Sequence, residues 1–188
     1  MKRTLILTLI LLGLPAAPAM ARAEHSLFVN GDSLAVGTQP YFPGALPGWS
    51  IRTSATISRH AFEGASVLRA QGGSLARVIF VSLGTNDDPR NTSSFRSSVH
   101  SIMTAAGPSR CVVWATIVRP AVAGASYAGY NRILKAEAKA RPNLRVFRWR
   151  ALLSKHPEWL GPDGVHVTGV GYAARAREIA KKITACPK

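Results

Sequence analysis

Two stretches of the chain carry residue types that together can attack a carbonyl carbon. Ser33 stands at a tight turn in "VNGDSLAVG" (29–37), where it acts either as a nucleophile or as a helix cap. A serine hydroxyl is a poor nucleophile until a base takes its proton, and that base needs a third group to orient it. "GPDGVHVTGVGY" (161–172) supplies His166 as the base and Asp163, three residues earlier, as the orienting carboxylate. These partners favour the nucleophile over the cap.

Such a reaction also needs donors for the negative charge that develops on the carbonyl oxygen. "LGTND" (83–87) offers the side-chain amide of Asn86, a neutral donor on a Gly-Thr turn. The backbone N–H groups of Ser33 and of a nearby glycine can complete an oxyanion hole. Gly64 is the candidate glycine.

The elements that position these residues alternate along the chain. Five apolar, β-branched runs predict strands at 26–30, 50–57, 77–83, 111–118 and 144–149. Helical patterns follow at 61–71, 92–106, 127–140 and 169–182, and Gly or Pro residues stand after three of them. This alternation predicts a mostly parallel sheet that is covered by helices on both faces.

The reactive residues follow the ends of different strands. Ser33 comes after the first strand, Asn86 after the third, and Asp163 with His166 after the fifth and a long loop. In open α/β sheets, reactive groups collect at the carboxyl ends of the strands, where the strand order reverses. We therefore expect these four residues to meet at one edge of the sheet.

Four blocks in this order resemble the signature of the SGNH/GDSL hydrolase (lipase/esterase) family: "GDSL" (31–34), the glycine of "FEGAS" (62–66), "GTND" (84–87) and "DGVH" (163–166). The resemblance implies a flavodoxin-like three-layer α/β/α sandwich with a five-stranded, mostly parallel sheet. It also implies serine-esterase chemistry with no metal and no organic cofactor. By matching position, it assigns Ser33 as nucleophile and first oxyanion donor, Gly64 and Asn86 as further donors, His166 as base, Asp163 as its orienting partner, and Asp32 as a turn-holding residue.

The N-terminal segment has the layout of a secretory signal peptide. Lys2 and Arg3 precede an apolar run, and cleavage after Ala21 or after Ala23 satisfies the small-x-small rule. We divide the chain into a signal peptide (1–23) and one hydrolase domain (24–188) and expect a secreted or periplasmic protein. No later apolar run approaches the roughly 20 residues that cross a bilayer, so no stable membrane insertion is expected.

The chain is strongly basic. It holds 24 Lys and Arg against 9 Asp and Glu, and removal of Lys2, Arg3 and Arg22 with the leader still leaves a formal charge of +12. Such a charge favours encounter with anionic polymers, including those of the cell envelope. The basic residues are scattered, with no cluster beyond "RVFRWR" (145–150) and no nucleic-acid motif, so no specific nucleic-acid partner is predicted. We expect a monomer.

Two cysteines, Cys111 and Cys186, are present. Export would place them in an oxidising compartment, where a disulfide can persist. Free buried cysteines are also common, so the sequence leaves both states open.

Other polar residues have plainer interpretations. His25, His60, His100 and His156 lack the spacing of a metal site. Asp87 and Asp88 could be read as paired acid/base carboxylates, but adjacent side chains diverge, and turn or N-cap roles are favoured. Arg119 is either a surface residue or a contact for an anionic group of a substrate.

These observations predict an exported serine esterase that forms an acyl-enzyme. Two loops, 38–49 and 119–130, are expected to rim an open pocket suited to short acyl groups, such as acetyl groups on a cell-envelope polysaccharide or a small-molecule ester. One alternative is an O-acyltransferase that uses the same site. Another is a cationic envelope-binding protein on an inactive hydrolase scaffold.

Overall fold

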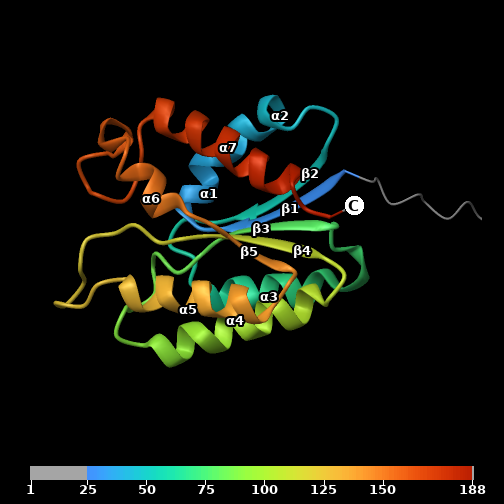
Figure 1. The fold of residues 1–188 in the computed structure, drawn as a ribbon, viewed down its shortest axis with the longest axis horizontal. Coiled ribbons are helices and arrows are strands. Elements are labelled where there is room, and N and C mark those ends of the chain that lie inside the picture. The colour runs from blue at the N-terminus through green and yellow to red at the C-terminus, as the bar shows by residue number, and fades with distance from the viewer. Residues whose placement is uncertain (1–24, 188) are drawn as a thin grey trace, which may run out of the picture.

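A computed structural model describes residues 25–187, so the expected signal peptide lies outside the described residues. Five strands form one sheet in the order β2-β1-β3-β4-β5 (Figure 1). All four neighbouring pairs are parallel. The strands are β1 (Ser26–Gly31), β2 (Ser50–Ala55), β3 (Val78–Ser82), β4 (Cys111–Ala115) and β5 (Leu144–Phe147).

Helices cover both faces of this sheet (Figure 1). One face carries α1 (Ser33–Thr38), α2 (Phe42–Ala45) and α7 (Gly169–Thr184), and α6 (Trp149–Leu153) packs on the same side. The other face carries α3 (Ala61–Gln71), α4 (Thr92–Ala106) and α5 (Ala128–Ala140). The predicted three-layer α/β/α sandwich is therefore confirmed.

The sheet forms because alternate side chains of each strand enter two separate hydrophobic cores. In β4, Val112 and Trp114 pack toward α3, α4 and α5, whereas Cys111 and Val113 pack toward α7. All five residues of β4 are buried, which explains its continuous apolar sequence. Strand β2 lies at the edge of the sheet and is largely exposed.

The predicted long helices agree with the structure to within one or two residues, but the short ones were missed. Helices α1, α2 and α6 span 6, 4 and 5 residues, too few to show a helical periodicity in the sequence. The fourth strand was predicted three residues too long. Beyond Ala115 the backbone leaves the sheet, and the side chain of Asn131 bonds both the N–H and the carbonyl of Ile117.

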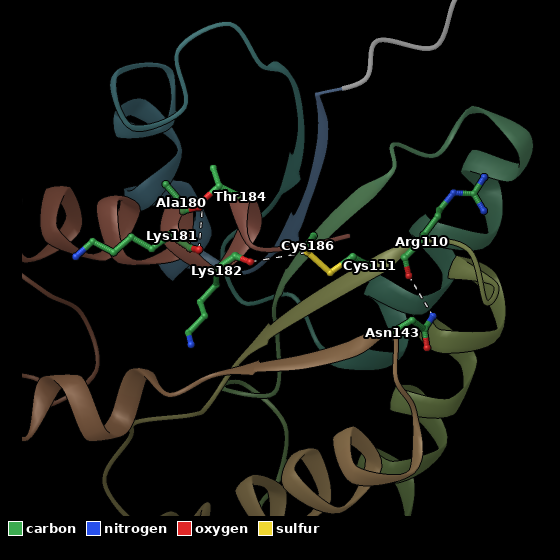
Figure 2. Close-up of a disulfide and its surroundings, with 8 residues drawn as sticks. All are labelled: Arg110, Cys111, Asn143, Ala180, Lys181, Lys182, Thr184 and Cys186. Atoms are coloured by element: carbon green, nitrogen blue, oxygen red, sulfur yellow. Dashed lines mark hydrogen bonds between the residues drawn. A yellow bond between two sulfur atoms is a disulfide. The ribbon is translucent and has the colours of Figure 1, made fainter. Parts of the chain in front are cut away.

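The two cysteines form a disulfide, which settles the question that the sequence left open. Cys111 is the first residue of β4, and Cys186 follows the last turn of α7 (Figure 2). Their Cα atoms lie 6.0 Å apart. The bond ties the C-terminal helix to the amino end of the sheet.

No helix within residues 25–187 combines the length and apolar character needed to cross a membrane.

The strand order reverses between β1 and β3, because β2 lies on one side of β1 and the remaining strands lie on the other. In doubly wound sheets the carboxyl side of such a reversal is the usual position of a ligand site. Ser33 and Asn86 follow these two strands.

Candidate active site

Ser33 lies at the junction between β1 and α1. The N-cap of α1 is Asp32, whose carboxylate accepts a hydrogen bond of 3.0 Å from the N–H of Leu34. Ser33 is thus the first helical residue and is not the cap. Its hydroxyl lies 2.8 Å from Nε2 of His166. Since no described hydrogen bond uses the backbone N–H of Ser33, that donor remains available at the helix start.

His166 and Asp163 form a close pair in the loop before α7. His166 Nδ1 lies 2.6 Å from Asp163 Oδ2, so a hydrogen-bonded series runs from the Ser33 hydroxyl through the imidazole to the carboxylate. Asp163 Oδ1 also accepts bonds from the backbone N–H groups of Val165 and His166. The bond to His166, followed by these backbone bonds, lowers the pKa of Asp163 to about 2. The carboxylate therefore stays ionised near neutral pH.

The loop that holds this pair is fixed by its own backbone. Gly164 has φ +68, a conformation that favours glycine, and Gly161 donates its N–H to the carbonyl of His166 at 2.7 Å. Leu160 and Val167 form an isolated antiparallel bridge. The loop then leads into α7, whose N-cap Thr168 accepts a bond from the N–H of Gly171. His166 thus lies two residues before the N-cap of a long helix.

Asn86 is oriented by two arginine residues. Its Nδ2 donates to the carbonyl of Arg59 at 3.3 Å, and its Oδ1 accepts a bond from Arg119 at 3.4 Å. Arg119 also donates to the carbonyl of Thr85 at 2.7 Å. An amide nitrogen carries two hydrogens, so one remains for a ligand. Arg119 is half-buried, and its guanidinium bonds to the loop that contains Thr85 and Asn86.

A cavity of about 390 Å³ joins these residues. Ser33, Asn86, Asp163 and His166 all line it, so the structure brings these four predicted residues together. The loop after β4 adds Arg119, Pro120, Ala121 and Val122 to the lining, in agreement with the expectation for loop 119–130. The loop 38–49 contributes no lining residue and instead contains the 3₁₀ turn Gln39–Tyr41 and helix α2.

Gly64 lies elsewhere, and its expected role as oxyanion donor has to be corrected. It is a buried residue in the first turns of α3, and its N–H donates to the carbonyl of His60 at 3.2 Å. A Cβ at this position would collide with the side chain of Leu83. Gly64 is therefore a packing glycine between helix and sheet, with its N–H committed to the helix.

Ser58, which belongs to none of the four sequence blocks, lines the cavity that Gly64 does not line. It follows β2, lines the cavity beside Ile57, and has φ 63. No described hydrogen bond uses its N–H. Left-handed backbone of this kind favours glycine, so the conformation cannot be inferred from a serine. No signal in the sequence points to Ser58.

A buried polar network supports the turn that carries Ser33. Arg175 of α7 has no exposed surface and donates to Ser82 Oγ at 3.1 Å and to Thr38 Oγ1 at 2.8 Å. Ser82 Oγ in turn lies 3.3 Å from Asp32 Oδ1. Burial lowers the pKa of Arg175 to about 10 and raises the pKa of Asp32, while the attraction between the two charges opposes both shifts. Asp32 has the turn-holding position that the resemblance implies.

The remaining polar candidates have structural partners. Asp87 accepts bonds from the N–H of Ala61 at the start of α3, and Asp88 pairs with Arg90 at 2.6 Å. His100 contacts Glu137, and His156 contacts Glu158. Within residues 25–187, no group of three or more His, Cys, Asp or Glu side chains is placed to hold a metal ion.

No protein-family model and no curated protein sequence matches this chain. Solved structures do match it. The C-terminal catalytic domain of Streptococcus pneumoniae peptidoglycan O-acetyltransferase A, solved with a methylsulfonyl adduct, superposes with a TM-score of 0.68 and 20% identity, over 88% of this chain and 93% of that one.

Two further structures agree over similar lengths. A lipolytic G-D-S-L family protein from Veillonella parvula gives a TM-score of 0.71 at 14% identity, over 86% of this chain and 99% of that one. The esterase EstA from Pseudoalteromonas sp., inhibited by monoethylphosphonate, gives 0.66 at 12% identity, over 86% and 97%. The fold is therefore the one that the resemblance to the SGNH/GDSL hydrolases predicted.

Proposed function

We propose that this chain, which has the fold of the SGNH/GDSL hydrolases, is an exported serine esterase that cleaves carboxylic esters of short acyl groups. One observation carries the proposal. The Ser33 hydroxyl, the His166 imidazole and the Asp163 carboxylate stand in hydrogen-bonding series, at 2.8 Å and 2.6 Å, inside a cavity. This is the arrangement in which a base can remove the proton of an attacking serine.

The reaction follows from these contacts in two steps. Ser33 Oγ attacks the ester carbonyl carbon while its proton passes to His166 Nε2, and the resulting tetrahedral intermediate collapses when His166 protonates the leaving alcohol. A water molecule then gives a proton to His166 Nε2 and attacks the acyl carbon. The second tetrahedral intermediate collapses when the bond between that carbon and Ser33 Oγ breaks and His166 returns the proton to Oγ, which releases the acid. Asp163, ionised throughout, holds the imidazole in one orientation and stabilises its charged form.

The oxyanion donors proposed for this site are the free hydrogen of the Asn86 amide and the backbone N–H groups of Ser33 and Ser58. Each belongs to a residue that lines the cavity, and each is without a competing described acceptor. Loss of one such donor costs about 10²–10³ in rate in other enzymes. Ser58 takes the place that Gly64 had in the sequence-based assignment.

The exposure of the site supports a small acyl group, and the disulfide supports an extracellular setting. Asp163 is exposed and His166 is half-buried, so a bulky alcohol can remain outside while its acyl group reaches Ser33. The disulfide between Cys111 and Cys186 is of a kind that persists in oxidising compartments, consistent with the predicted signal peptide. An acetylated cell-envelope polysaccharide is the substrate class that we favour.

The direct test is hydrolysis of p-nitrophenyl acetate by the wild type, Ser33→Ala and Ser66→Ala. Ser66 is an exposed serine of α3 that bonds only to its own helix, so its removal controls for loss of any serine. We expect Ser33→Ala alone to lose turnover and labelling by a fluorophosphonate, with an unchanged melting temperature. Undiminished turnover in Ser33→Ala would refute the assignment. Absence of labelling in the wild type would favour a cationic binding protein on an inactive scaffold.

An O-acyltransferase is the second candidate, because one of the matching structures is the catalytic domain of a peptidoglycan O-acetyltransferase. The same acyl-serine would then pass its acyl group to a sugar hydroxyl instead of water. Turnover of an acetyl donor with and without added oligosaccharide acceptor separates the two. Acetylated oligosaccharide in the products would identify a transferase, and free acetate alone would identify a hydrolase.

A further inference from the structure

A second cavity, of about 480 Å³, lies between α5 and α6 on the carboxyl side of β4. We call it the basic groove. Its lining includes four basic residues, Arg132, Lys135, Arg148 and Arg150, and no acidic residue. Thr116 and Asn131 also line it.

The backbone explains why the four basic side chains converge. Arg132 and Lys135 are three residues apart on α5 and therefore lie on one face of that helix. Arg148 and Arg150 flank Trp149, which is fully buried in the core. Both arginines are exposed, and the N–H of Arg150 is anchored at 2.9 Å on the Thr116 hydroxyl oxygen. The positions of both pairs are thus set by well-packed elements.

Unlike the basic residues that surround Glu137 of α5, these four cations have no acidic partner among the described residues. On the opposite side of the helix, Glu137 accepts contacts from Arg96, His100 and Arg141 at 2.9–3.2 Å. Among the described residues, no ion pair and no hydrogen bond involves the side chain of any of the four groove cations, since the bond from Arg150 to Thr116 uses the backbone N–H. Four like charges around one concavity repel one another unless an anion enters.

The groove and the catalytic cavity share one connecting segment. Thr116 lines the groove, and the same loop continues through Arg119 to Val122, which line the catalytic cavity. Both cavities therefore lie at the carboxyl edge of the sheet. A chain-like ligand that occupies one is well placed to extend into the other.

We propose that the basic groove binds the oxyanion groups of a negatively charged polysaccharide whose ester lies in the catalytic cavity. The proposal rests on the esterase function proposed above and adds the substrate class. Arginine pairs with carboxylate and phosphate oxygens in two-point contacts, which suits repeated acidic groups along a chain. A single-stranded nucleic acid fits less well, because no aromatic side chain lines the groove for base stacking.

The test compares a groove variant with a charge-matched control. The groove variant carries Arg132→Gln, Lys135→Gln, Arg148→Gln and Arg150→Gln. The control removes the same charge from exposed positions outside the groove, through Arg69→Gln, Lys139→Gln, Arg177→Gln and Lys182→Gln. Binding of polygalacturonate and of neutral dextran is measured by calorimetry. Ester cleavage is measured on O-acetylated polygalacturonate, on O-acetylated glucomannan and on p-nitrophenyl acetate.

We expect the groove variant to lose about tenfold or more in polygalacturonate affinity and in kcat/KM on its acetylated form. Turnover of p-nitrophenyl acetate and of acetylated glucomannan should stay within about twofold of wild type, and the control should retain polygalacturonate binding. Equal losses in the control, or no loss in the groove variant, would overturn the proposal. Tighter groove-dependent binding of an oligothymidylate than of polygalacturonate would also overturn it.

The calorimetric readout keeps this proposal separate from the esterase assignment. If the wild type binds polygalacturonate through the groove but cleaves no ester, the groove assignment stands and the proposed reaction fails. If the wild type cleaves p-nitrophenyl acetate but does not bind polygalacturonate through the groove, the proposed reaction stands and the groove assignment fails.

Discussion

The two ends of the sheet are built for different tasks. At the carboxyl end, Ser33, Asn86 and His166 are partly exposed and belong to loops or to the first turn of a helix. At the amino end, the disulfide between Cys111 and Cys186 joins a buried strand to the end of α7 (Figure 2). Groups that must meet a substrate are thus separated from the covalent bond that holds the fold.

Helix α7 connects these two ends. The loop with His166 leads directly into its first turn, Arg175 lies buried at its middle, and the disulfide follows its last turn. This helix of 16 residues therefore links the position of His166 to the sheet that Ser33 follows. Changes along α7 should affect activity at its start and stability toward its end.

The largest effect on activity is expected for a change just before the first turn of α7. His166→Ala should lower kcat/KM for p-nitrophenyl acetate by about 10³-fold or more. In a serine–histidine–aspartate triad, loss of one member costs nearly as much activity as loss of all three. The melting temperature should barely change, since the side chain is half-exposed. His156→Ala is the matched control in the same loop region, where the imidazole stacks on Trp159 and contacts Glu158. Similar losses of kcat/KM in both variants would show that the conformation of the loop, rather than the imidazole of His166, determines the activity.

The pH dependence of the same assay sharpens this point. The pKa of Asp163 is lowered to about 2, so its ionised form, and the stability that comes with it, persists above the ordinary value of 3.8 and is lost only as the pH falls toward 2. In the pH profile of kcat for p-nitrophenyl acetate, protonation of Asp163 should therefore cause a loss only as the pH falls toward 2. A loss of kcat that followed protonation of this carboxylate at its ordinary value of 3.8 would contradict the expectation.

The middle of α7 should affect stability and activity together. Arg175→Met removes the donors to Ser82 and Thr38 and the positive charge that opposes the raised pKa of buried Asp32. Leaving buried polar groups without partners costs about 1–3 kcal/mol. Since Asp32 caps α1, Ser33 should also be displaced and kcat should fall. Arg177→Met, an exposed neighbour on the same helix, should change the free energy of unfolding by less than about 0.5 kcal/mol. Urea denaturation of both variants measures the difference, and equal small changes would refute the role of Arg175.

Removal of the disulfide at the amino end of the sheet should lower stability without changing activity. Replacing both cysteines by serine frees a loop with a sequence separation of 75, and loss of a native disulfide costs about 2–5 kcal/mol. The folded double variant should keep its kcat for p-nitrophenyl acetate at 25 °C and melt at a lower temperature. A large loss of kcat in the folded variant would mean that the two ends of α7 are mechanically coupled.

The same contrast explains what the sequence could predict. Long amphipathic helices and buried strands follow from periodicity, and the positions of Ser33, Asn86 and His166 follow from the rule that strand ends share an edge. Arg175 could not be found in this way, because arginine is ordinarily a surface residue and its burial depends on Thr38 and Ser82, which lie far from it in the sequence. The role given to Gly64 failed for the opposite reason. Its residue type fits, but its backbone N–H is used inside α3.

The smallest predicted effects test the backbone conformation at Ser58 and the packing role of Gly64, since both substitutions keep the backbone N–H. Ser58→Gly keeps the N–H and relieves the left-handed conformation at φ 63, so it should leave kcat within about twofold and stabilise the fold by up to about 1 kcal/mol. Gly64→Ala should instead destabilise by about 1–3 kcal/mol, because the added methyl group meets Leu83 in the core. Its kcat in the folded protein should persist. A loss of kcat in Gly64→Ala at full stability would contradict a role for Gly64 in packing alone.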